Sequence, residues 1–198
     1  MGAEIVLPPA DDVVGVLTSQ HERVRALLAE LHETVAAVAD ITADMAEPFG
    51  ELVRLLVAHE AAEELVVYPA LRRELEEGRL VEARTAEEHE AKQQLARAEK
   101  LAEGFFAFPA ALAELEALVL AHAEHEEQTV FPRLEQGLPA DERLRLGADV
   151  HYAAARAPTH AHAHSPESAV GQAVLGPVMA ALDRLRDARE LHLPPRTH

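Results

Sequence analysis

The chain has 198 residues, 48% of them hydrophobic, which is enough for one domain with a sizeable core and a tail. A formal net charge of −17 at pH 7 argues against nucleic acid and anionic membranes as partners, because both attract basic surfaces. The absence of cysteine excludes disulfides, cysteine-ligated iron–sulfur clusters and thiol catalysis.

The N-terminal stretch, MGAEIVLPPADD, lacks the basic region and the long apolar run of a signal peptide. No stretch of the chain reaches the ~18 uninterrupted apolar residues that a membrane span needs. Val6 also stands where a myristoylation signal has Ser or Thr. We therefore expect a cytoplasmic protein without a membrane partner.

Four long helical patterns come first, since apolar residues recur three, four and seven residues apart among good helix formers. They span residues 11–37, 48–75, 80–103 and 109–136, and the third has few large apolar residues. Short breaks containing Gly or Pro separate them. Short connections make antiparallel neighbours, so the sequence predicts an all-α, up-down-up-down four-helix bundle over residues 1–140.

The C-terminal part of the chain has a different amino-acid composition. An additional helix is expected over residues 141–156. Residues 157–198 begin with APTHAHAHSPES, typical of a His-rich linker, and continue into a predicted amphipathic helix and a tail. The alternating His160, His162 and His164 could bind a metal weakly, but a solvated loop is the favoured interpretation.

One motif occurs twice: HEAAEELVVYP at residues 59–69 and HAEHEEQTVFP at residues 122–132. On a helix, side chains four residues apart lie within ~6 Å of each other, so the His and Glu of each motif share a face. That face is also the apolar face of its helix. A buried, unpaired carboxylate costs several kcal/mol, so a compensating partner is required.

His21 and His89 lie on the apolar faces of the first and third helices, at nearly the same separation as the two motifs. A bundle can bring these four imidazoles and two carboxylates together, a set that suits two metal ions with bridging carboxylates. Nitrogen and oxygen donors without sulfur favour iron or manganese, with zinc as a contaminant. A single buried His is more often hydrogen-bonded in a core, but four at repeat-related positions favour the dinuclear site.

The paired motif, closing once in VVYP and once in TVFP, resembles the hemerythrin-like (HHE cation-binding) domain family over roughly residues 11–136. The resemblance implies a four-helix bundle around a non-haem diiron centre, bridged by oxo or hydroxo and by two carboxylates. Its implied metal ligands are His21, His59, Glu63, His89, His122 and Glu126, with Glu63 and Glu126 as the bridges.

The sequence departs from the oxygen-carrying hemerythrins, which have His-x-x-x-His on the third helix and His-x-x-x-x-Asp on the fourth. Here Gln93 follows His89 by four residues, and the fourth helix reads His-x-x-x-Glu. The missing histidine suggests a labile metal position, which suits reaction with peroxide, O₂ or nitric oxide better than reversible O₂ storage.

Several neighbours of the motif are further candidates. Tyr68, Gln93 and His125 are candidates for touching the ligands without binding metal, although Tyr68 and Phe131 are expected mainly to pack the end of the bundle. Three glutamates that each follow a ligand are expected on the solvated face: Glu60, Glu64 and Glu127.

The leading hypothesis is a diiron protein that reacts with hydrogen peroxide, O₂ or nitric oxide, a reaction that would make it an oxidoreductase with an unidentified redox partner. The alternative is an iron or oxygen sensor, or an O₂-binding module without turnover. A ferritin-like di-iron carboxylate protein ranks low, because His21 and His89 stand where that class places lone carboxylates.

Overall fold

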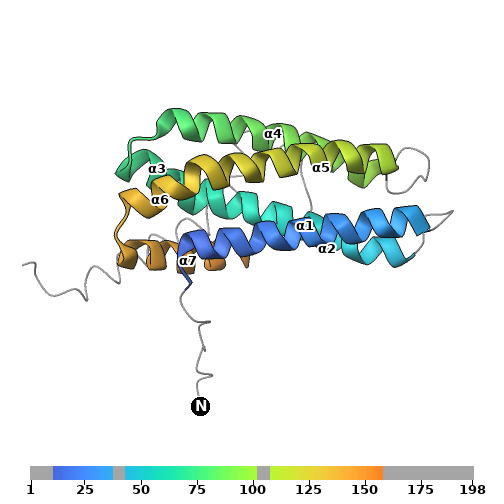
Figure 1. Cartoon of the computed structure of the whole chain (residues 1–198), viewed down its shortest axis with the longest axis horizontal. Helices are drawn as coiled ribbons and strands as arrows, with labels where there is room; N and C mark the ends of the chain where they lie inside the picture. Colours follow the sequence, from blue (N-terminus) through green and yellow to red (C-terminus); the bar gives the residue numbers. More distant parts are fainter. Residues whose placement is uncertain (1–10, 38–42, 102–107, 158–198) are drawn as a thin grey trace, which may run out of the picture. The chain divides into compact units, whose positions relative to one another are not determined.

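The computed structural model describes residues 11–37, 43–101 and 108–157, and all regular structure in these ranges is helical (Figure 1). The elements in chain order are α1 (Val13–Ala37), α2 (Ala43–Ala62), η1 (Glu63–Val67), α3 (Tyr68–Glu74), α4 (Gly78–Leu101), α5 (Phe108–His125), η2 (Glu126–Val130), α6 (Phe131–Gly137) and α7 (Ala140–Ala154). The predicted all-α class is confirmed.

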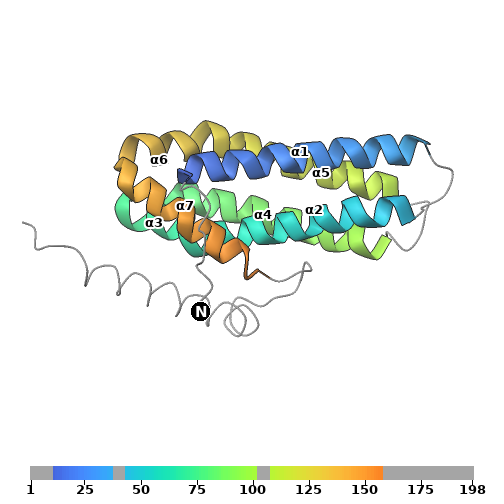
Figure 2. The ribbon, with the colours of Figure 1, turned by 90° about the horizontal axis from the view of Figure 1, so that it is seen from below.

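Two antiparallel helix pairs, α1 with α2 and α4 with α5, form the expected four-helix bundle (Figures 1 and 2). The half of the bundle away from α3 and α6 has an apolar core that includes Leu31, Leu52 and Leu112. Phe49 meets Phe108 edge to face there, with ring centroids 5.0 Å apart. The half nearer α3 and α6 contains the buried polar side chains.

Each repeated motif contains a π-helical turn: η1 joins α2 to α3, and η2 joins α5 to α6. The amide of Tyr68 donates to the carbonyl of Glu63, and that of Phe131 to the carbonyl of Glu126, five residues back in both cases. The proline that follows each aromatic residue has no N–H, and its ring would strike the carbonyl four residues earlier in a regular helix. The wider turn avoids this clash.

The predicted additional helix is present as α7, which packs against α1 and α2 (Figure 2). Asp12 ties the two segments together: its Oδ1 accepts from the Val14 amide at 2.9 Å and caps α1, while its Oδ2 accepts from Arg143 Nε at 2.6 Å. Gly147 of α7 lies directly against the chain entering α1. A Cβ at this position would collide with the carbonyl oxygen of Asp11.

The predicted C-terminal amphipathic helix and the alternating histidines lie outside the described residues. The chain divides into two compact units, residues 1–163 and 164–198, and every described residue belongs to the first. Among the described residues, no helix is long and apolar enough to cross a membrane.

Gly147→Ala should lower the free energy of unfolding by about 1–3 kcal/mol, because the new methyl group forces α7 away from the start of α1. Gly15→Ala is the matched control: nothing lies within 4 Å of a Cβ there, so improved helix propensity should stabilise the protein by up to ~1 kcal/mol. Urea unfolding followed by circular dichroism measures both. Equal effects of the two substitutions would contradict the close packing of α7.

Candidate metal centre

Three buried histidines lie at the centre of the polar half of the bundle: His21 of α1, His59 of α2 and His122 of α5. Four glutamates are buried with them. These are Glu60, Glu63, Glu88 and Glu126, each at most 5% exposed. The four-residue spacing in each motif therefore does place a His and a Glu together on the inner face, as the sequence predicts.

Glu126 lies among all three imidazoles. Its Oε2 is 3.3 Å from His21 Nε2, 3.8 Å from His59 Nε2 and 3.6 Å from His122 Nε2. Glu63 Oε2 lies 3.4 Å from His59 Nε2 and 3.9 Å from His122 Nε2. Both carboxylates thus face imidazoles from the two halves of the repeat, which is the position of a group that bridges two cations.

The inner donor atoms form two groups, in each of which the atoms lie within 4.8 Å of one another. The first group contains His21, His59 and Glu126, and the second contains Glu63, Glu88 and His122. Two groups of three donors match two cations better than one. Five of the six residues proposed from the sequence belong to these groups, and the exception is His89.

Each buried imidazole is oriented by a hydrogen bond at its outer nitrogen. His21 Nδ1 pairs with Glu127 Oε1 at 2.9 Å, His59 Nδ1 with Gln20 Oε1 at 2.8 Å, and His122 Nδ1 with Glu87 Oε2 at 3.1 Å. These acceptors hold the proton on Nδ1 and leave the Nε2 lone pair directed at the centre, as in metal-binding histidines.

Nothing in the sequence alone indicated these three hydrogen-bond partners. Gln20 and Glu87 carry no motif of their own, and Glu127 was assigned to the solvated face. Glu127 is in fact 34% exposed and also accepts from Arg25, at 2.9 Å. Only their placement could have indicated these partners. Each lies either next to, or across a helix pair from, a histidine on an apolar face.

Several inner donor atoms have no hydrogen-bond partner among the described residues: both carboxylate oxygens of Glu63, Oε2 of Glu88 and of Glu126, and Nε2 of His122. Leaving such an atom unsatisfied costs about 1–3 kcal/mol, and more when the group is charged. Cations at the centre would satisfy all of them. The residues present therefore fit a pair of metal ions, and their nitrogen and oxygen donors suit iron or manganese.

Burial sets the protonation of this cluster. Burial, together with the charges of Glu126 and Glu88, raises the pKa of Glu63 well above its ordinary value. Burial alone would also raise the pKa of Glu126, but the imidazoles of His21 and His59 hold it below its ordinary value. Burial lowers the pKa of His59, which keeps that imidazole neutral and able to bind a metal.

His89 does not reach the centre, and the expectation that it faces the bundle interior is wrong. It is exposed, and the Gln93 amide nitrogen lies 2.8 Å from its Nε2. The buried face of α4 includes Val81, Glu88 and Leu95 instead. With few large apolar residues in this helix, the sequence left its rotation uncertain by one residue, which is about 100°.

Gln93 is exposed as well, and its side chain contacts His89 outside the buried centre. The idea of a labile metal position at residue 93 loses its structural basis. His125 is 49% exposed and connects to His122 only through Glu87, whose Oε1 lies 2.9 Å from His125 Nδ1.

Tyr68 does more than pack the end of the bundle. Its hydroxyl donates to Glu88 Oε1 and lies 3.4 Å from Glu126 Oε1. In the other half of the repeat, the ring of Phe131 stacks on His21, with centroids 5.4 Å apart. The aromatic residue after each π turn therefore contacts a side chain of the centre.

Glu60 is buried, contrary to the expectation that it lies on the solvated face. Lys92 of α4 compensates it, with Nζ 3.4 Å from Glu60 Oε2, and also pairs with the more exposed Glu64. The rotation of α4 about its axis brings Lys92 over the end of α2. Because the sequence did not predict this rotation, it did not predict the ion pair.

An antiparallel helical bundle with buried histidine and glutamate donors defines a cation-binding helical domain. The hemerythrin HHE cation binding domain matches residues 12–134, and the chain belongs to this family. An uncharacterized hemerythrin-like protein of Schizosaccharomyces pombe (strain 972) is 32% identical over 137 residues, which cover 68% of each chain. No solved structure matches the chain. The resemblance inferred from the paired motif is thereby confirmed.

The metal-free protein should lose stability as the pH rises, because of Glu60. Burial raises the pKa of Glu60 from 4.5 to about 7, so the folded state holds the proton more tightly than the unfolded state. This stabilisation is complete below pH ~4.5 and is lost as the pH rises through about 7. Relative to Glu60→Gln, the parent's free energy of unfolding should fall by up to ~3 kcal/mol over that window.

Urea unfolding of the chelator-treated parent and of Glu60→Gln, in pH steps across this window, measures the difference. Glu124→Gln, at an exposed position of α5, controls for loss of a surface charge. If the difference in free energy of unfolding between the parent and Glu60→Gln stays constant between pH 4.5 and 7, Glu60 titrates normally.

Proposed function

We propose that this protein holds a dinuclear non-haem iron centre and reacts with a small oxidant: hydrogen peroxide, O₂ or nitric oxide. The observation that carries the proposal is the convergence of three Nε2 atoms on the Oε2 atoms of two buried carboxylates, neither of which has a hydrogen-bond partner among the described residues. Iron is preferred to calcium or magnesium because imidazole nitrogen contributes half of the donors.

In this proposal His21, His59 and His122 would hold the two ions, and Glu63 and Glu126 would be their shared carboxylate ligands. Bound iron supplies the redox chemistry that these side chains lack. The protein's own contribution is orientation: Glu127, Gln20 and Glu87 fix the rings from outside, so little reorganisation is needed when the oxidation state changes.

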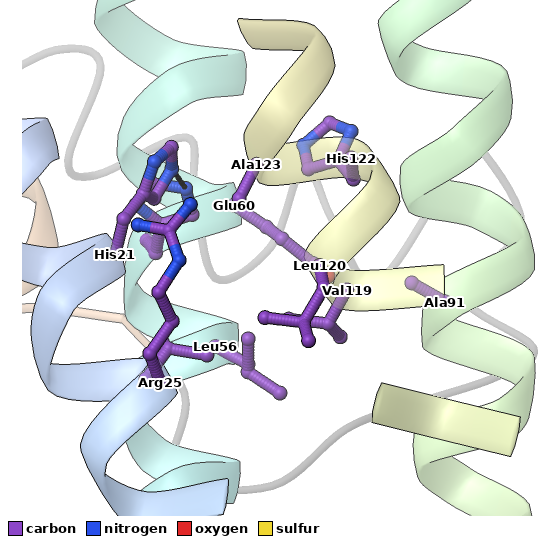
Figure 3. Close-up of a pocket in the computed structure, with 11 residues that line it drawn as sticks. His21, Arg25, Leu56, Glu60, Ala91, Val119, Leu120, His122 and Ala123 are labelled. Atoms are coloured by element: carbon purple, nitrogen blue, oxygen red, sulfur yellow. Dashed lines mark hydrogen bonds between the residues drawn. The ribbon is translucent and has the colours of Figure 1, made fainter. Parts of the chain in front are cut away.

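A small pocket lies beside the three imidazoles and limits the size of the reactant (Figure 3). Its volume is about 20 Å³, where one water molecule needs about 10–15 Å³ on the same measure. Apolar side chains line most of it, including Leu56, Val119 and Ala123. A molecule of two heavy atoms fits this space, whereas a larger organic substrate does not.

Glu60 is the acidic group that lines this pocket (Figure 3). Burial raises its pKa to about 7, so near neutral pH its carboxyl can hold a proton beside the imidazoles. Reduction of peroxide or O₂ consumes protons. Lys92 connects Glu60 to the partly exposed Glu64, which provides a polar route between the pocket and the surface.

Protein from iron-replete cells should contain about two irons per chain, as the two donor groups imply. Glu63→Ala and Glu126→Ala should each lower this content. In the metal-free protein the same changes relieve desolvation and repulsion, so apo stability should hold or rise. In the iron-loaded protein they remove a bridge, so holo stability should fall.

Metal analysis and thermal unfolding with and without iron measure these effects, and Glu114→Ala, a 55% exposed surface residue, is the control. Parallel losses of apo and holo stability would identify Glu63 and Glu126 as ordinary structural residues. Zinc alone in iron-replete expression would contradict the diiron assignment. Stoichiometric binding of oxidant without turnover would identify a sensor or O₂-binding module.

Val119→Phe should slow peroxide consumption by about tenfold or more, a barrier increase of ~1.4 kcal/mol, because the larger ring fills the pocket. The iron content should stay at the parent value, since Val119 donates nothing to the centre. Leu118→Phe, on the adjacent flank of α5 outside the pocket, is the matched control and should react at the parent rate. Stopped-flow kinetics decide the comparison, and equal rates for both variants would place the reaction elsewhere.

A further inference from the structure

We propose that Glu88 is a metal ligand, in the place expected for His89, and that the two metal positions are therefore chemically unequal. The inference rests on the proposed dinuclear function and assigns to it a ligand that the sequence motif does not contain. It concerns which residue of α4 completes the second donor group.

The Glu88 carboxylate is buried in an environment that suits a metal ligand. Glu88 is 1% exposed, and its Oε2 has no hydrogen-bond partner among the described residues. Lys92 Nζ is 3.9 Å from that oxygen, which is beyond hydrogen-bond distance. The carboxylate lies within one donor group with Glu63 and His122. A cation bound by this group would offset the charge of the buried Glu88 carboxylate, whose Oε2 has no hydrogen-bond partner among the described residues.

The internal repeat of the chain also supports Glu88 as the ligand. Phe131, which follows the second π turn, stacks on His21 of α1. Tyr68, at the same place after the first π turn, contacts Glu88 of α4. The repeat therefore equates Glu88, and not His89, with the metal-facing His21. A phenol also suits a carboxylate neighbour, because its hydroxyl can donate to the carboxylate, whereas a phenyl ring suits an imidazole face.

The Glu88 carboxylate is also oriented by a hydrogen bond. The Tyr68 hydroxyl donates to Glu88 Oε1 and so holds the carboxylate in place, while Oε2 has no hydrogen-bond partner among the described residues. The three imidazoles are held in the same way, each by a hydrogen bond at its outer nitrogen. Glu88 is thus held in the way that the other proposed ligands are held.

His89 cannot take this role without a rearrangement of α4. Neighbouring residues on a helix are separated by about 100° of rotation. Turning His89 inward would carry Glu88 and the buried Val81, Ala91 and Leu95 away from the core. The burial of those apolar side chains opposes the rotation.

The consequence is an asymmetric centre. One group offers two imidazoles and one carboxylate, and the other offers one imidazole and two carboxylates. Oxygen donors favour harder ions and higher oxidation states, whereas imidazole suits ferrous iron. The three carboxylates Glu63, Glu88 and Glu126 together carry a charge that two divalent cations offset. We expect the two ions to differ in affinity and in spectrum.

The test compares two adjacent residues in the full-length protein. Parent, Glu88→Gln and His89→Gln are loaded anaerobically with ferrous iron and desalted, and bound iron is measured per chain. Glu88→Gln keeps the shape of the side chain but removes the charged donor. We expect about two irons in the parent and in His89→Gln, and about one in Glu88→Gln, following the two donor groups. Mössbauer spectra should show two unequal iron environments in the parent and one in Glu88→Gln.

Each outcome has a distinct meaning. A parent that binds no iron overturns the proposed function and this inference together. A parent with two irons, whose content Glu88→Gln leaves unchanged, overturns only the assignment of Glu88. Iron lost from His89→Gln but not from Glu88→Gln assigns the ligand to His89. Thermal unfolding of the metal-free variants checks folding, and Glu88→Ala provides a second removal of the carboxylate if the Gln variant unfolds.

Discussion

Carboxylates buried beside imidazoles in the interior of a helical bundle constrain every other part of this structure. Glu63 and Glu126 are fully buried, and most of their inner oxygens have no partner among the described residues. Burial alone disfavours such charges by several kcal/mol each. A cation at the centre would offset this cost, and its binding would then contribute to the folding free energy.

The two prolines after the motifs contribute to the geometry that this centre needs. Each enforces a π-helical turn that begins at the glutamate, so the carboxylate leaves a widened stretch of backbone. The turn also redirects the aromatic residue that precedes the proline, so that Tyr68 and Phe131 contact side chains of the centre. The π-helical turn thus explains why each motif ends in an aromatic residue followed by a proline.

The bundle has an apolar half and a polar half, and α7 packs against the start of α1. Asp12 and Gly147 bring α7 against the start of α1, the helix that carries His21. The apolar core occupies the opposite half, where Phe49 and Phe108 meet. The pocket beside the imidazoles is small and lined largely by apolar side chains.

The sequence by itself determined the bundle, the family and five of the six residues proposed as ligands, because helical periodicity and the repeated motif place His21, His59 and His122 on strongly apolar faces. It could not determine the rotation of α4, whose apolar face is weak and whose inward residue is Glu88 instead of His89. It also could not reveal Gln20, Glu87 and Glu127 as partners of the imidazoles. Those contacts join residues far apart in the chain or on facing helices, so only the packing of one helix against another decides them.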